Sequence, residues 1–134
     1  MDLAKIEETL TGSGDHREQV MFPNGRGVSI IRNPHSYGGR DGMFEVAVLD
    51  KDGDLDYSTP VTTDVMGYLT VSEVLGAMTA VAELPEEGSK EDKVLKLKSA
   101  REQLENDIAA LERKLDNKRR DYGDLNRDIS ALEG

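Results

Sequence analysis

Four cationic and aromatic side chains in the first third of the chain are suited to binding an anion. Guanidinium groups pair with carboxylate and phosphate oxygens, and a tyrosine adds a flat face and a hydroxyl. Glycines beside them would cradle a phosphate if they opened a helix, but they fall between predicted strands. Two interpretations stay open: turn glycines with solvated arginines, or a candidate ligand surface formed by Arg26, Arg32, Tyr37 and Arg40.

A second group is the run of alternating carboxylates DKDGDLD, which contains Asp50, Asp52, Asp54 and Asp56. A calcium loop needs Gly at its sixth position and Glu at its twelfth, and this run supplies neither. It predicts an Asp-rich turn. On an exposed hairpin, alternating carboxylates would imitate nucleic-acid phosphates and bind a basic partner, although the glycine within the run is expected to bend it.

Catalytic groups are few. The chain has no cysteine and two histidines, His16 and His35, both in predicted loops. His35 neighbours Ser36 and Tyr37, but the sequence assigns no third group to orient a nucleophile and base. We therefore expect no enzymatic activity, no cofactor and no metal site.

The last third of the chain follows a heptad pattern from residue 94 to residue 132, without proline. Ten of the twelve core positions are apolar, and such a run over more than five heptads predicts a coiled-coil oligomerisation helix. Its length, roughly 58 Å at 1.5 Å per residue, calls for a partner helix. The ten apolar core residues are Val94, Leu97, Leu104, Ile108, Leu111, Leu115, Tyr122, Leu125, Ile129 and Leu132.

The two charged core positions, Arg101 and Lys118, bear on how copies of the chain pair. In a parallel pair each would face its own counterpart, and four flanking pairs would bring like charges together. An antiparallel overlap centred near Arg113 places Arg101 opposite Leu125 and Lys118 opposite Ile108, and it makes the flanking pairs attractive. We predict an antiparallel dimer, with a tetramer of two such pairs or a coil with another protein as alternatives.

The preceding residues predict a small sheet. An Asn-Gly pair between two β-prone runs is typical of a hairpin, and two further runs are expected to extend it. The fold class is α+β: a small antiparallel meander of about four strands packed on a helix, followed by the long coiled-coil helix. The expected strands are 19–22, 28–32, 43–49 and 55–58.

Two helices complete this part. Residues 2–11 predict a short helix, and 71–84 a longer one, because Thr70 and Glu73 have capping-box spacing and apolar residues then recur every three or four positions. Gly76 within it suggests a close approach of helix and sheet. The domains are then 1–84 as a small head, 85–93 as a hinge and 94–132 as the coiled coil.

Charge and composition limit the partners. The net charge is −10, and residues 1–85, with 14 acidic and 6 basic side chains, carry −8 of it. Such a head disfavours direct nucleic-acid binding and favours a basic partner, or simply solubility. The first residues do not resemble a signal peptide and no stretch is apolar enough for a membrane span, so we expect a cytoplasmic protein.

The stretches FPNGRGVSIIRNPHSYGG (22–39) and FEVAVLDKDGDLDYSTPVTTDVMGYLTVSEV (44–74) resemble a family of small bacteriophage and prophage proteins of uncharacterised function. The resemblance covers about residues 22–84, and the coiled coil lies outside it. It implies a viral accessory role in the cytoplasm of a bacterial host, and it transfers no catalytic residues.

Together these features predict a phage accessory protein that binds a host or phage protein, for example to inhibit a host or anti-phage defence factor. The alternatives are a protein that binds or sequesters an anionic, nucleotide-like small molecule, and a structural or assembly component of the virion.

Overall fold

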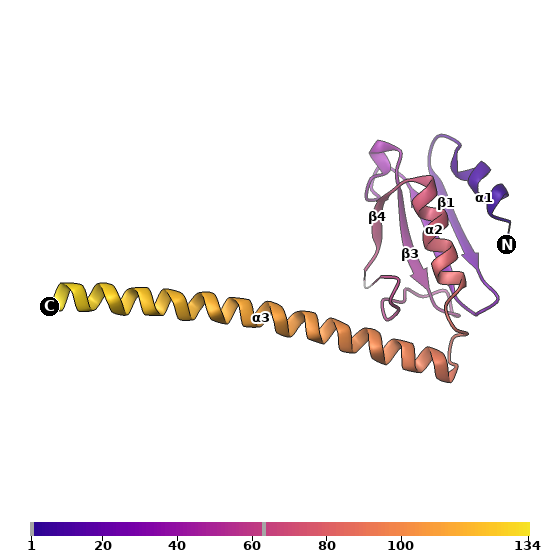
Figure 1. Cartoon of the computed structure of the whole chain (residues 1–134). Coiled ribbons are helices and arrows are strands. Elements are labelled where there is room, and N and C mark those ends of the chain that lie inside the picture. Colours follow the sequence, from indigo (N-terminus) through magenta and orange to yellow (C-terminus); the bar gives the residue numbers. More distant parts are fainter. Residues whose placement is uncertain (1, 63) are drawn as a thin grey trace. The chain divides into compact units, whose positions relative to one another are not determined.

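The computed structural model describes residues 2–62 and 64–134 and confirms an α+β protein (Figure 1). By close contacts between residues, the chain divides into two compact units, Met1–Ser99 and Ala100–Gly134. The elements in chain order are α1 (Leu3–Leu10), β1 (His16–Met21), β2 (Gly27–Arg32), the short 3₁₀ helix η1 (Gly39–Asp41), β3 (Phe44–Leu49), β4 (Met66–Leu69), α2 (Val71–Ala82) and α3 (Lys90–Glu133).

The four strands form one antiparallel sheet in the order β1-β2-β3-β4. The predicted Asn-Gly hairpin joins β1 to β2, and Gly25 adopts the positive φ of 83° that the turn requires. Alternate residues of the strands point to α2, which lies across one face of the sheet (Figure 1). The core between them includes Val28, Ile30, Phe44, Val46, Val48, Val74, Met78 and Val81.

The fourth strand is not the predicted one. Residues 55–58 form only an isolated bridge between Leu55 and Leu49, whereas β4 comes from Met66–Leu69. The chain turns away at Asp56, whose N–H donates to the carbonyl of Val48 at 2.9 Å while its side chain points into the interior. A buried ion pair thus takes the place of strand pairing at this point.

α2 begins as predicted with a capping box, in which Thr70 and Glu73 exchange hydrogen bonds between side chain and backbone. Its C-terminal end is capped from far away in the sequence. The Asn24 amide donates to the carbonyls of Val81, Ala82 and Leu84 at 2.9, 3.3 and 3.0 Å. The helix therefore ends at Ala82, two residues before the predicted end.

Gly76 does not mark a close helix–sheet approach. It is exposed, and a Cβ built on it would meet no atom within 4 Å. That interpretation of the glycine was wrong, because α2 turns its valines and Met78 to the sheet and Gly76 to the outside.

α3 is a continuous helix of 44 residues. It starts at Lys90, inside the predicted hinge, where the Ser89 hydroxyl accepts the N–H of Asp92 at 3.1 Å. Its first ten residues belong to the first compact unit and the remainder to the second. Among the described residues, no helix is both long and apolar enough to cross a membrane.

Candidate interaction surfaces

One stripe of α3 carries a row of exposed apolar side chains, here called the seam. It consists of the ten predicted apolar heptad residues, from Val94 to Leu132, and every one of them is exposed. Leu97, Leu104 and Leu111, for example, expose 72%, 62% and 63% of their surface. A soluble chain rarely leaves so long an apolar row uncovered, so the seam is suited to packing against another helix.

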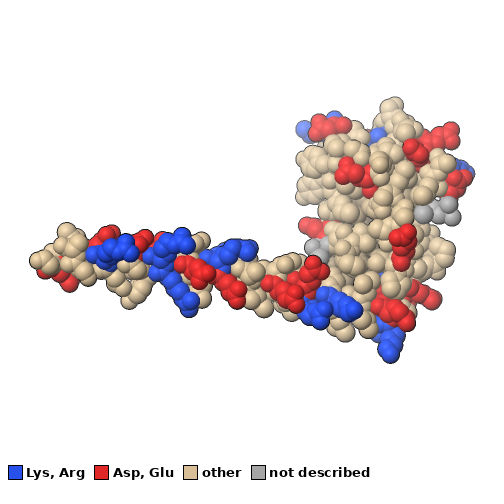
Figure 2. All heavy atoms as spheres, viewed as in Figure 1, with Lys and Arg blue, Asp and Glu red and all other residues tan. Residues whose placement is uncertain are grey.

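Charged residues lie between and around the apolar side chains of the seam. Figure 2 shows acidic and basic side chains interspersed along α3. Arg101 lies 3.9 Å from Glu105, and Arg127 lies 3.5 Å from Asp124, and all four side chains are more than half exposed. Exposed pairs of this kind contribute at most about 1 kcal/mol each, so a partner helix can rearrange them at little cost.

The predicted ligand surface requires Arg26 to be exposed, but Arg26 is not a surface residue. Its side chain is fully buried. Nη1 donates to Asp56 Oδ2 at 3.0 Å, Nη2 donates to Asp92 Oδ1 in the first turn of α3, and Nε donates to the carbonyl of Pro85 at 3.5 Å. All three guanidinium nitrogens are engaged inside the protein, and Arg26 therefore cannot bind an external anion in this conformation.

Lys96 completes this buried cluster. Its Nζ lies 3.9 Å from Asp56 Oδ2 and 3.7 Å from Asp92 Oδ2, so that two cations face two carboxylates. Burial alone would raise the pKa of Asp56, but hydrogen bonds from Ser58 and the charges of Lys96 and Arg26 together lower it below its usual value. The charge-balanced cluster joins the β1–β2 turn, the loop after β3 and the start of α3.

Arg32 and Arg40 do lie together, because both line one cavity of about 410 Å³. Arg32 is 9% exposed, donates to two carbonyls of the loop before β1 at 2.7 and 2.8 Å, and stacks 4.6 Å from the centre of the Phe44 ring. Arg40 Nε donates to the carbonyl of Pro34 at 3.2 Å. Two of the four predicted ligand residues thus share a site, although both already bind protein carbonyls.

Tyr37 belongs to a different surface, beside β4. Tyr37 and Tyr68 expose 59% and 58% of their surface, and the Tyr68 N–H donates to the Tyr37 carbonyl at 3.2 Å. Tyr37 packs directly on Gly67, where an added Cβ would lie 2.5 Å from the Tyr37 Cβ. Tyr68 adopts a φ of 56°, which is strained for an aromatic residue and is typical of functional positions. Two exposed tyrosines on a closely packed backbone suit a protein partner.

The acidic run does not form a row of four exposed carboxylates. Asp50 folds back and accepts the N–H groups of Asp52 and Asp54 at 2.9 and 3.0 Å, around Gly53 with a φ of 81°. Asp56 is 8% exposed and paired with Arg26. Only Asp52 and Asp54 stay exposed, so the predicted imitation of regularly spaced phosphates is lost.

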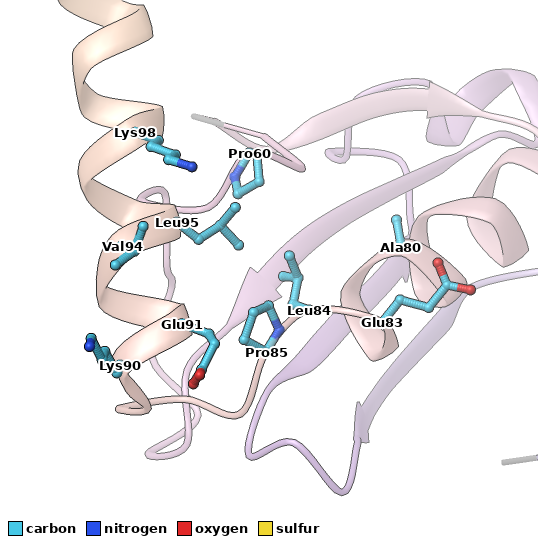
Figure 3. A pocket seen from close by; sticks show the side chains of 10 residues that line it. All are labelled: Pro60, Ala80, Glu83, Leu84, Pro85, Lys90, Glu91, Val94, Leu95 and Lys98. Atoms are coloured by element: carbon cyan, nitrogen blue, oxygen red, sulfur yellow. The ribbon is translucent and has the colours of Figure 1, made fainter.

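Sequence patterns gave no indication of an apolar groove of about 660 Å³ in the first unit. In Figure 3, Leu95 and Lys98 of α3 point across it toward Leu84 and Pro60, while the Glu91 carboxylate turns downward at its edge. The groove joins residues that are distant in the chain, and its apolar lining is Pro60, Ala80, Leu84, Pro85, Val94 and Leu95. Val94 belongs to the groove and to the seam.

The two histidines lie in different parts of the first unit, and His16 Nε2 lies 3.2 Å from Glu18 Oε2. His16 begins β1 instead of lying in a loop, and its ring meets Phe44 edge-on with centroids 6.0 Å apart. His35 lies in the loop after β2, where its backbone N–H donates to the Asn33 side-chain oxygen at 2.8 Å. Within residues 2–62 and 64–134, no three His, Asp or Glu side chains are grouped to hold a metal ion.

Comparisons of the chain with protein-family models, curated proteins and solved structures found no match.

Proposed function

We propose that this is a non-enzymatic interaction protein that dimerises through the seam of α3 as an antiparallel coiled coil. The observation that carries the proposal is the exposure of all ten apolar heptad residues. Fully burying a large apolar side chain contributes about 1.5–3 kcal/mol, so even partial cover of ten such side chains on each helix favours association.

The charged core positions support the antiparallel orientation. When the residue numbers of facing core positions add to 226, Arg101 meets Leu125 and Lys118 meets Ile108. Moving the partner by one heptad in one direction would stack Arg101 on Lys118, and moving it in the other would leave Val94 without a partner. A parallel pair would stack each charge on itself. One antiparallel register therefore keeps like charges apart and uses every layer.

An experiment with spin labels tests both association and orientation. Arg113 and Ser130 lie at outer heptad positions, and the chain has no cysteine of its own, so Arg113→Cys or Ser130→Cys gives one label per chain. In the antiparallel dimer the two labels at 113 are close, while those at 130 are about 50 Å apart along the axis, at 1.5 Å per residue. Equal short distances at both sites would contradict the orientation, and a monomer in sedimentation would contradict the dimer.

The biological role that we propose is that of a phage accessory protein in the cytoplasm of a bacterial host. The resemblance of residues 22–84 to phage and prophage proteins supports it, and the net charge of −8 over residues 1–85 favours a basic host or phage protein as partner. Blocking a host or anti-phage defence factor is one form that this role takes. The exposed Tyr37 and Tyr68 supply the aromatic contacts typical of protein interfaces.

This role is tested by co-purification from infected cells with the intact protein and with the double variant Tyr37→Ser/Tyr68→Ser. A partner bound by the intact protein and lost in the double variant would support the role. Met21→Ser, at an exposed position of β1, is the control for loss of exposed apolar surface. Enrichment with purified virions instead would favour the alternative of a structural or assembly component.

A second candidate function is the binding of an anionic, nucleotide-like small molecule in the cavity that Arg32 and Arg40 line. The observation that favours it is that Arg32 and Arg40 line one cavity of about 410 Å³, which Asp15 also lines. A thermal-shift screen with nucleotides would detect such a ligand, because a ligand that binds only the folded state raises its apparent stability. Arg40→Ala should abolish the shift, whereas Arg17→Ala, at an exposed position of β1, should not.

A further inference from the structure

The groove and the seam meet at Val94. Val94 is 41% exposed, lines the groove, and is the first core residue of the heptad pattern. Glu91 and Lys98, three residues before it and four after it, also line the groove, so one edge of α3 from residue 91 to 98 faces it (Figure 3). A helix packed on Val94 therefore lies at the mouth of the groove.

We infer that this groove receives the last turn of α3 from a second copy of the chain. The inference rests on the proposed antiparallel dimer. In the register that separates like charges, Leu132 of the second copy faces Val94, and its Ile129 faces Leu97. Leu132 is 90% exposed within its own chain, and a two-helix seam covers a core residue from one side only. The apolar side chains of Leu84 and Pro85 in the groove wall would bury more of this end of the partner helix.

Charged residues of both signs, Glu83, Lys90, Glu91 and Lys98, line the groove, and Lys98 is the one that the coil register matches to a carboxylate of the second copy. Lys98 lies in the groove wall, four residues after Val94 and on the same edge of α3. Glu133 follows Leu132 directly, so the second copy brings a carboxylate to the end that enters the groove. The flanking pairing of the antiparallel coil matches Lys98 with Glu133. A neutral or basic last turn would lack this pairing, which is why a second copy fits better than a generic apolar peptide.

The consequence is that the dimer is more than two paired helices. The first unit of each copy would hold the end of the other copy's α3, so that Pro60, Ala80 and Leu84 become interface residues although they lie outside the heptad pattern. The two groove contacts, related by the twofold axis of the dimer, would define the register of the coil.

Crosslinking tests this contact directly. Ala80 is an exposed residue of α2 in the groove, and Ser72 is an exposed residue of α2 outside it. Mixed Ala80→Cys and Glu133→Cys chains, treated with a flexible bismaleimide, should give a covalent heterodimer. Mixed Ser72→Cys and Glu133→Cys chains should not. Equal crosslinking from both positions on α2 would overturn the inference.

Blocking the groove supplies a second measurement. Ala80→Arg should fill the groove without burying a charge in the core, and it should raise the dimer dissociation constant about tenfold, equivalent to about 1.4 kcal/mol. Ser72→Arg, with the same added charge on the same helix, should leave the constant unchanged. If the antiparallel dimer forms but neither crosslinks nor responds to Ala80→Arg, the inference about the groove is wrong and the proposed dimer still stands. The groove would then have another occupant. A monomer, or a parallel dimer, would overturn the proposed function as well.

Discussion

Arg26 and Asp92 form a buried ion pair between the β1–β2 turn and the first turn of α3, 66 residues apart in the sequence. Arg26 is fully buried and Asp92 is 1% exposed. Neither charge could be held there alone, because moving an unpaired ion from water into the interior costs several kcal/mol. The pair thus makes the start of α3 part of the first unit, and several predictions about stability depend on it.

Removing Arg26 should be strongly destabilising. Arg26→Leu leaves two buried carboxylates, Asp56 and Asp92, with one partly exposed lysine, and we expect the free energy of unfolding to fall by about 3–5 kcal/mol. Urea unfolding followed by circular dichroism measures this change. Arg17→Leu, at an exposed position of β1, is the matched control and should change it by less than about 0.5 kcal/mol. Equal effects of the two substitutions would show that the cluster contributes little.

The cluster should also make the free energy of unfolding depend on pH in the acid range. Because the pKa of Asp56 is lowered in the folded protein, the unfolded chain takes up this proton first as the pH falls. The contribution of Asp56 is therefore complete above its ordinary value of 3.8 and is lost below it, as the pH approaches the folded pKa. Asp56→Asn should lower the free energy of unfolding at pH 7 and flatten its decline between about pH 5 and 2.

Glu45 offers a control of opposite sign. Burial raises its pKa above the usual 4.5, so the folded protein takes up this proton first and gains stability relative to the unfolded chain as the pH falls. Glu45→Gln removes that gain and should make the decline in acid steeper. Identical acid profiles for Asp56→Asn and Glu45→Gln would contradict the assignment of the two shifts.

Charges in the middle of the seam should abolish self-association. Leu111 faces Leu115 in the proposed register, so Leu111→Asp with Leu115→Asp places carboxylates opposite one another in a desolvated layer. We expect the dissociation constant to rise at least about a thousandfold, equivalent to about 4 kcal/mol. Sedimentation velocity measures it. Asn106→Asp with Asn117→Asp adds the same charge at outer positions and should leave the dimer intact. A dimer that survives in both variants would place the interface elsewhere.

Two glycines should respond to alanine in opposite directions. A Cβ on Gly39 would lie 1.8 Å from the carbonyl oxygen of Asn33, so Gly39→Ala forces the backbone apart and should destabilise the first unit by more than about 1 kcal/mol. Gly76 lies in α2 with open space around its Cβ position, so Gly76→Ala should stabilise it by about 1 kcal/mol. Thermal unfolding of both variants gives the comparison. A destabilising Gly76→Ala would mean that α2 meets another surface there.

Local patterns were sufficient for much of this fold. The hairpin, the strand at β3, the capping box of Thr70 and the long C-terminal helix are each encoded by residues close together in the sequence, through turn chemistry, alternation and heptad spacing. β4 was missed because four residues with an unusual backbone at Tyr68 present no alternating pattern.

The surface features that the sequence did not predict depend on side chains that lie far apart in the chain and meet only in the folded protein. Arginine and aspartate usually lie on the surface. No sequence pattern near Arg26 or Asp56 predicts that the two form a buried ion pair. The apolar groove likewise joins Pro60, Leu84 and Leu95 from three separate segments. The seam was the one surface that could be predicted, because a single helix contains all of it.

The side chain of Asn24 has a consequence for how the protein folds. The last carbonyls of α2 accept hydrogen bonds from an amide that sits in the β1–β2 turn, while the N–H of Arg26 donates to the oxygen of the same side chain at 3.0 Å. The last turn of α2 therefore lacks its cap until the hairpin has closed. Hairpin and helix should form and open as one cooperative unit, so that hydrogen exchange of amide protons in both gives a common free energy of opening.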